Sequence, residues 1–123
     1  MKGVFVLPIR LHSLNEYIGA CRRNAKQGAR MKRTDQEIII WHIKAQMKGV
    51  RFRRPVRMVY KWYEPNKKRD LDNISSYGRK VIQDALVECG VLGGDGWNYI
   101  SGFRDEFYID TKQEKIIVEI FEG

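Results

Sequence analysis

Residues 70–90 read DLDNISSYGRKVIQDALVECG, and this stretch carries the clearest periodic pattern in the chain. The apolar side chains are Ile74, Tyr77, Val81, Ile82, Ala85, Leu86 and Cys89. They recur at three- and four-residue intervals, which places them along one face of an α-helix. Gly90 follows, and glycine readily adopts the conformation that ends helices. We therefore expect an amphipathic helix that packs on a core and ends at Gly90.

Alternating side chains indicate strands on both sides of this helix. Residues 55–63 place Val56, Met58, Tyr60 and Trp62 on one face. Residues 4–11 read as a first strand, and residues 99–110 and 115–121 as a closing hairpin.

Two capping boxes indicate further helices near the N-terminus. Ser13 with Glu16 predicts a helical start, and Thr34 with Glu37 predicts a second helix that runs to Lys48. The order β-α-α-β-α-β-β predicts an α+β fold (a mixed α/β layer), with a small sheet of about four strands packed with two or three helices. A chain of 123 residues is long enough for one domain, residues 1–123.

The charge distribution favours a polyanionic partner. The net charge is +8; residues 1–69 hold 18 Lys and Arg against 4 acids, and residues 70–123 hold 5 against 11. Phosphates are bound largely through Lys and Arg, whereas a hard divalent cation needs carboxylates. This arrangement is typical of a metal-dependent nuclease, although a well-solvated basic surface gives the same balance.

Several classes of protein are disfavoured. No apolar run is long enough for a membrane helix, and the apolar start is too short for a signal peptide. We expect a cytoplasmic protein without a membrane partner. Two cysteines and two histidines lack paired zinc-ligand spacing, so we expect no zinc; they are Cys21, Cys89, His12 and His42.

The aspartates at the start of residues 70–90 are candidate metal ligands. Asp70 and Asp72 are two residues apart, so an extended backbone would point both carboxylates to one side and Leu71 toward the core. Such a pair would offer Mg²⁺ two oxygen ligands. The alternative is that Asp72 or Asn73 only caps the following helix.

The sequence allows two interpretations for each of two further charged residues, Lys80 and Asp95. Lys80 lies on one helical strip with Asn73 and Asp84, so its ammonium group has two interpretations: a phosphate contact near the aspartates, or a pair with Asp84. Asp95 lies in a loop with three glycines, where a simple turn would also explain it.

Taken together, these motifs resemble the RusA family of crossover-junction endodeoxyribonucleases. The resemblance rests on Asp70-Leu71-Asp72-Asn73, a helical lysine, Asp84-Ala85-Leu86, a Gly90-Val91-Leu92 turn and a loop aspartate, together with Leu14-Asn15-Glu16-Tyr17 near the start. It implies a single RusA-like endonuclease domain and a homodimer that binds branched DNA. Such a dimer would resolve four-way (Holliday) junctions by paired symmetric nicks, using Mg²⁺ or in its place Mn²⁺, in DNA recombination and repair.

The same resemblance implies roles for individual residues. It assigns catalysis to Asp70, Asp72, Asp95 and Lys80, with the three aspartates as metal ligands. The candidate DNA-binding residues are Asn15, Arg22, Arg23, Lys67, Lys68, Arg69 and Asn73. Two departures stand out: Gly94 replaces a loop aspartate common in the family, and Lys80 comes about one helical turn later. The alternatives are a non-catalytic DNA-binding protein and a nuclease that prefers flaps, forks or RNA.

Overall fold

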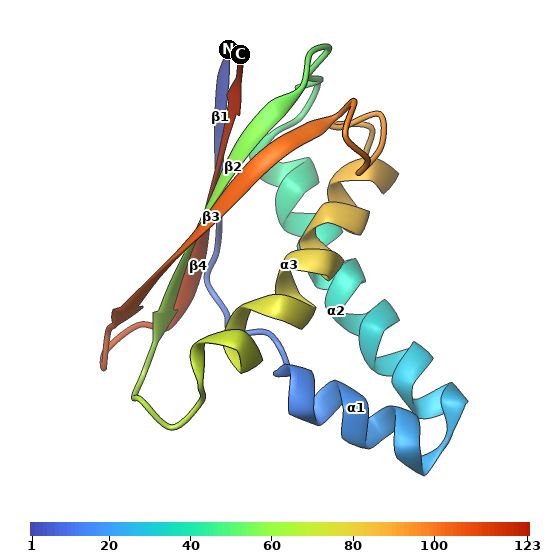
Figure 1. The fold of residues 1–123 in the computed structure, drawn as a ribbon, viewed down its shortest axis with the longest axis vertical. Helices are drawn as coiled ribbons and strands as arrows, with labels where there is room; N and C mark the ends of the chain where they lie inside the picture. Colours follow the sequence, from blue (N-terminus) through green and yellow to red (C-terminus); the bar gives the residue numbers. More distant parts are fainter.

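A computed structural model describes all residues from 1 to 123, and its seven elements follow the predicted order. They are β1 (Lys2–Leu7), α1 (Leu14–Arg23), α2 (Ala25–Gln46), β2 (Val56–Glu64), α3 (Leu71–Glu88), β3 (Ile100–Ile109) and β4 (Lys115–Glu122). The helices lie on one side of a four-stranded sheet: α2 and α3 pack on the sheet, and α1 packs against α2 and α3 (Figure 1). This confirms the predicted α+β fold. None of the helices is both long and apolar enough to cross a bilayer.

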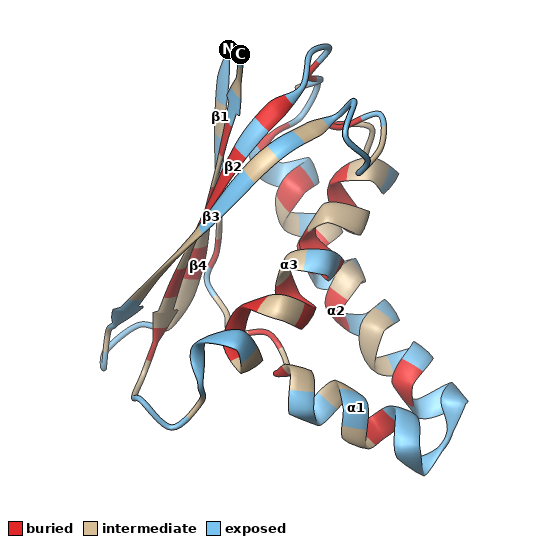
Figure 2. Ribbon diagram, viewed as in Figure 1, coloured by how far each residue is buried: buried red, intermediate tan, exposed pale blue.

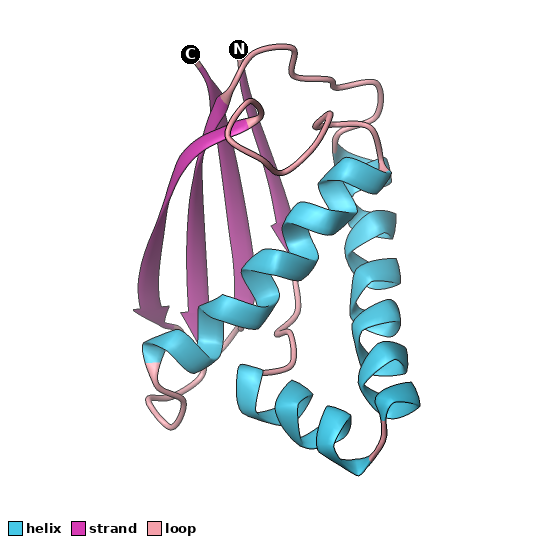
Figure 3. Ribbon diagram, turned by 45° about the vertical axis from the view of Figure 1, so that its right-hand side comes forward, coloured by secondary structure: helices cyan, strands magenta, loops and turns pink.

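The strand order corrects one prediction. The order is β1-β4-β2-β3, with β3 parallel to β2 and β4 antiparallel to both β1 and β2 (Figure 3). The expected hairpin of residues 99–110 and 115–121 is therefore wrong, because β2 lies between them. The chain crosses the end of β2 instead: the Asp110 N–H donates to the Glu64 carbonyl at 2.8 Å. The Asp110 side chain then accepts from the next turn and reverses the chain.

The core forms between the covered face of the sheet and α3. Met58, Tyr60 and Trp62 on β2 are at most 1% exposed, and so are Val81 and Ile82 on α3. Buried residues line the facing sides of the sheet and helices (Figure 2). The predicted faces of both elements are confirmed, and so is the glycine stop, because Gly90 has a φ of 75°. Burial of these apolar surfaces positions α3 across the sheet.

The boundary between the first two helices differs from the prediction. The capping box of Ser13 and Glu16 is confirmed at the start of α1. However, α2 begins at Ala25, where the Asn24 side chain accepts from the Gln27 N–H, and no helix starts at Thr34. Residues 25–33 contain good helix formers and no proline, so the helix propagates through the second capping pattern.

The first strand is shorter than expected because it ends at Leu7 rather than residue 11. Pro8 follows, and proline has no N–H to donate to the neighbouring strand. Beyond it, the Arg10 guanidinium binds the buried Glu64 carboxylate at 2.9 Å. This ion pair ties the connection before α1 to the end of β2.

Candidate metal and DNA-binding site

Asp70 and Asp72 lie at the beginning of α3 rather than in a strand. Asp70 occupies the N-cap position with an extended backbone, and its side chain makes no capping hydrogen bond. Asp72 is already in the first helical turn. The prediction that Leu71 points into the core is wrong: it is 57% exposed, because the helix begins at this residue.

Both carboxylates are exposed and have no cationic or hydrogen-bonding partner. Lys67 and Lys68 precede them and are also exposed, yet neither forms an ion pair. The positive end of the α3 dipole favours anionic groups at this position. Mg²⁺ commonly binds one or two carboxylates and keeps several waters, so these two side chains fit its preferences.

Arg69 has a different role from the two lysines before it. Its guanidinium donates to the Leu11 carbonyl at 3.0 Å and to the Glu16 carboxylate at 2.6 Å. The side chain is only 18% exposed. Arg69 therefore fastens the start of α1 to the start of α3, and its charge is engaged within the fold.

Asn15 and Asn73, two more of the candidate DNA-binding residues, are in contact where α1 meets the start of α3. The Asn15 main-chain N–H donates to the side-chain oxygen of Asn73 at 2.8 Å. This leaves the Asn15 side chain exposed beside the first turn of α3. Asn73 therefore contributes to the contact between α1 and α3.

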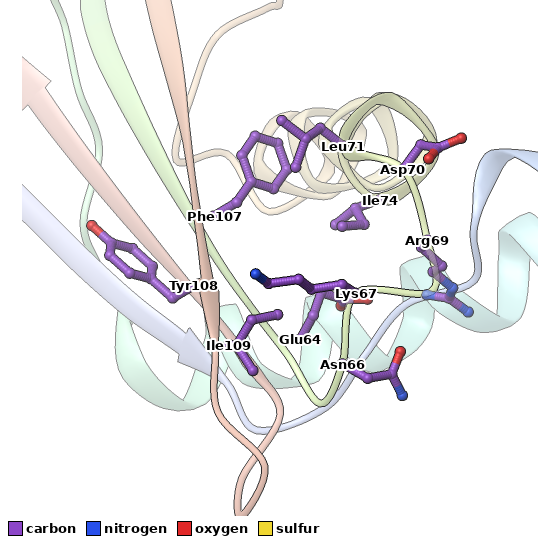
Figure 4. A pocket seen from close by; sticks show the side chains of 10 residues that line it. All are labelled: Glu64, Asn66, Lys67, Arg69, Asp70, Leu71, Ile74, Phe107, Tyr108 and Ile109. Atoms are coloured by element: carbon purple, nitrogen blue, oxygen red, sulfur yellow. The ribbon is translucent and has the colours of Figure 1, made fainter.

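A hollow of about 350 Å³ opens between the start of α3 and the end of β3 (Figure 4). Its apolar wall includes Leu71, Ile74 and Phe107. The Lys67 side chain points into the hollow, whereas the Asp70 carboxylate points away from it. The Lys67 ammonium therefore lies at the hollow and the Asp70 carboxylate on the opposite side, although the two residues are only three positions apart.

Lys80 and Asp95 come together midway along α3. The Lys80 ammonium contacts Asp95 at 2.7 Å and Asp84 at 2.9 Å. Of the two interpretations of Lys80, the structure shows the pair with Asp84, and the phosphate contact stays a prediction. Lys32 of α2 also contacts Asp84, at 3.2 Å; no spacing in the sequence indicates this pair, because the two residues lie on different helices.

The ion pair changes the pKa values of both partners. The hydrogen bond to Asp95, followed by that to Asp84, raises the pKa of Lys80. The hydrogen bond from Lys80 lowers the pKa of Asp95. Both groups are therefore charged at neutral pH, and the pair is lost as the pH falls through the lowered pKa of Asp95 or rises through the raised pKa of Lys80.

The three candidate metal ligands do not form one group. No three or more His, Cys, Asp or Glu side chains are placed together to hold a metal ion. Lys80 lies eight residues after Asp72, which is about 12 Å along the axis at the rise of an α-helix. The structure therefore contains an aspartate pair at the start of α3 and a separate Lys80–Asp95 pair further along it.

The arginines at the end of α1 form a third part of the basic surface. Arg22 and Arg23 are exposed in its last turn. Arg23 donates to Gln27 at 2.7 Å, and neither arginine forms an ion pair. Both arginines are therefore exposed to solvent, and their contact with DNA phosphates stays a prediction.

One polar cluster has no counterpart among the predicted residues. The buried Asp35 carboxylate accepts from the Tyr77 hydroxyl at 2.7 Å and contacts His12 Nδ1 at 2.8 Å. Burial, followed by the hydrogen bond to Asp35, raises the pKa of Tyr77. The sequence indicates this cluster only through Asp35, an acid on the apolar face of a helix. Its partners, His12 and Tyr77, come from distant segments and could not be predicted.

Comparison with known proteins adds no relative: no protein-family model matches the chain, and no curated protein matches it.

Proposed function

We propose that this protein is a Mg²⁺-dependent structure-specific endodeoxyribonuclease of the RusA type. It resolves four-way DNA junctions by paired symmetric nicks, in DNA recombination and repair. The observation that carries the proposal is the pair of exposed, unpartnered carboxylates of Asp70 and Asp72 directly after a basic segment. Free anionic oxygens beside unpaired lysines suit a hydrolase that holds a cation against a phosphodiester.

Each part of the site has a role in this reaction. Mg²⁺, when bound, lowers the pKa of water and stabilises charge on the phosphate. Asp70 and Asp72 hold the cation, and Lys67 and Lys68 bind neighbouring phosphates without reading sequence. Arg22 and Arg23 extend this contact along the DNA. Arg69 acts indirectly, because it positions the start of α3.

Asp95 is the third proposed ligand, and Lys80 controls it. In the structure Lys80 holds the Asp95 carboxylate. Asp95 would reach a cation at the start of α3 only if this ion pair opened and its loop moved toward Asp70 and Asp72. A DNA phosphate that attracts the Lys80 ammonium would favour opening, which couples substrate binding to completion of the site.

A homodimer is part of the proposal because paired nicks need two sites. The sheet face opposite the helices has no covering element (Figure 1). It presents Val4, Ile117 and Phe121 alongside charged residues. This face is the proposed interface, since a two-fold dimer matches the symmetry of a junction. A monomer by analytical ultracentrifugation at micromolar concentration that still makes paired nicks would contradict it.

A cleavage assay tests the proposed activity. Labelled four-way junction, fork, flap, duplex and single-stranded DNA, together with RNA, are incubated with Mg²⁺, with Mn²⁺ and with EDTA. We expect symmetric nicks in the junction with either metal ion and none with EDTA. Faster cleavage of forks, flaps or RNA would assign a different substrate to the same centre.

One observation favours a second candidate, a non-catalytic DNA-binding protein. The three aspartates do not form a three-ligand group. In that case the basic surface retains junctions, and the acids act only in local structure. The same assay separates the two functions, because this candidate binds junctions equally with Mg²⁺ and EDTA and cleaves none.

A further inference from the structure

Trp97 is an unusual surface residue. It is 89% exposed and lies two residues after Asp95, whereas the core tryptophan, Trp62, is 1% exposed. Large aromatic side chains normally gain stability from burial, and tryptophan is enriched where proteins bind partners. An indole this exposed contributes little to the fold.

The loop that carries Trp97 is well defined. The N–H groups of Tyr99 and Ile100 donate to the Gly96 carbonyl at 2.9 and 3.0 Å. The Tyr99 ring packs against Gly93 and Gly94, where a Cβ atom would approach ring carbons to 2.7 and 2.8 Å. A side chain at either position would displace the Tyr99 ring. The turn therefore fixes the backbone around Trp97 and leaves its indole outside the core.

A second exposed aromatic ring lies at the same place. Trp97 and Phe103 both line a hollow of about 380 Å³ that also includes Asp95 and Gln83. Phe103 is 53% exposed, and the Arg79 guanidinium lies 4.3 Å from the centre of its ring. The hollow therefore carries two aromatic surfaces, while the Arg79 guanidinium beside Phe103 is engaged in an ion pair with Asp105.

An unpaired basic segment runs beside this loop. Residues 51–54 read RFRR, and the side chains of Arg51, Arg53 and Arg54 form no ion pair or hydrogen bond. Hydrogen bonds join the adjoining backbone to the loop: from Phe52 N–H to the Val91 carbonyl and from Val56 N–H to the Tyr99 carbonyl, both at 2.9 Å. The two loops lie at the same end of the molecule (Figure 3).

The backbone of the basic segment is also fixed. The N–H groups of Arg53 and Arg54 donate to the Glu122 carboxylate at 2.8 and 3.1 Å. This anchors the main chain to β4 while both guanidinium groups remain available. Unpaired cations and exposed aromatic rings are the two components of single-stranded nucleic-acid sites.

We propose that Trp97, Phe103 and the arginines of residues 51–54 form a binding site for unpaired DNA nucleotides. The aromatic rings stack on bases, and the arginines bind the adjacent phosphates. A paired base inside a duplex does not expose its face, so the indole distinguishes unpaired from paired nucleotides. The inference rests on the proposed function, because it takes DNA as the substrate, and it adds recognition of unpaired nucleotides at a branch point.

Binding measurements without metal ions test this site separately from cleavage. Fluorescence anisotropy in EDTA measures the affinity for a short oligothymidylate and for a duplex of equal length. The variants are Trp97→Ala and the double change Arg53→Gln with Arg54→Gln. Trp41→Ala is the matched control, because Trp41 is 67% exposed but lies on α2. Circular dichroism confirms that each variant is folded.

We expect Trp97→Ala to weaken oligothymidylate binding about tenfold, and duplex binding less than twofold. The double arginine variant weakens binding to both and lowers the salt dependence, and Trp41→Ala changes neither. In the Trp41→Ala protein, oligothymidylate should quench the emission of Trp97.

Three results would overturn the proposal. They are no binding of oligothymidylate by the unmodified protein, an equal loss for single-stranded and duplex DNA in Trp97→Ala, and an equal loss in Trp41→Ala. These outcomes do not depend on nuclease activity. If the protein binds oligothymidylate through Trp97 but cleaves nothing with Mg²⁺, the proposed nuclease function fails and the nucleotide site stands.

Discussion

The two groups of acids on and near α3 differ in how their charges are satisfied. At its start, Asp70 and Asp72 are exposed and have no partner. Further along, Lys80 pairs with both Asp84 and Asp95, and Lys32 also pairs with Asp84, so two cations balance the two acids. Unpaired carboxylates can accept a metal ion without first breaking an ion pair. The comparison therefore favours the start of α3 as the place of the proposed cation, and it gives the Lys80 cluster a controlling role in that proposal.

The largest expected effect comes from Asp72→Asn at the start of α3. Asparagine has nearly the same shape but lacks the anionic ligand, so junction cleavage should fall by about 10³-fold or more. Binding without metal should not weaken, because a negative charge near the DNA is removed. Stability should change by less than about 1 kcal/mol, the usual size of a helix-terminus charge effect. Rates of nicking and anisotropy measure both consequences; a fully active variant would contradict the assignment.

Lys80→Met should have the next largest effect. The change leaves Asp84 and Asp95 without their shared cation, and it removes a positive charge near the substrate. We expect cleavage to fall about 10²-fold. The pKa of Asp95 should rise, because the hydrogen bond that lowers it is lost. NMR titration of the aspartate side chains measures this shift.

Lys32→Met is the matched control for the Lys80 cluster. It removes one cation from Asp84 but keeps the contact between Lys80 and Asp95. We expect cleavage within about threefold of the unmodified protein, because surface ion pairs contribute little. Equal losses in both lysine variants would show that overall charge, rather than the Lys80–Asp95 pair, determines the rate.

Arg69→Ala should act on stability more than on DNA affinity. It removes hydrogen bonds from a mostly buried guanidinium to Leu11 and Glu16. We expect the free energy of unfolding to fall by about 2 kcal/mol, as for hydrogen bonds of charged groups. Lys68→Ala, one residue away and exposed, should change it by less than about 0.5 kcal/mol. Urea unfolding compares the two, and equal effects would contradict the structural role of Arg69.

The smallest effect concerns the end of α1. Replacing Arg22 and Arg23 together by Ala should weaken binding to all DNA substrates alike. The slope of log affinity against log salt should decrease by about 2, one for each lost phosphate contact. Unchanged salt dependence with an altered cutting sequence would show that these arginines read bases instead.

Much of the fold could be predicted because the pattern of apolar residues is local. The interval from Ile74 to Leu86 identifies α3, and alternation in residues 56–62 identifies β2. The strand order could not be read in this way, since residues 110–114 are as short as a hairpin loop but cross the end of β2. The sequence predicts a helix start at Thr34, whereas α2 starts after Asn24. Both residues are good N-caps, and the sequence does not show that the helix continues unbroken from residue 25 through Thr34.

In the candidate site, too, local patterns could be predicted and contacts between distant segments could not. The sequence identifies the acids at the start of α3, and the pairing of Lys80 with Asp84 follows from helical spacing. It does not show that Arg69 is engaged by Leu11 and Glu16, because those partners are distant in sequence. The exposure of Trp97 could not be predicted either, because a tryptophan that follows glycines in the sequence can be buried or exposed.

Binding of Mn²⁺ tests the central claim most directly, because it reports on the metal site without requiring cleavage. Electron paramagnetic resonance measures free Mn²⁺ during titration of the unmodified protein, Asp72→Asn and Asp84→Asn. The account predicts that Asp72→Asn loses binding, while Asp84→Asn, at the charge-paired end of α3, retains it. Equal binding in the unmodified protein and Asp72→Asn, or loss only in Asp84→Asn, would contradict a metal centre at the start of α3.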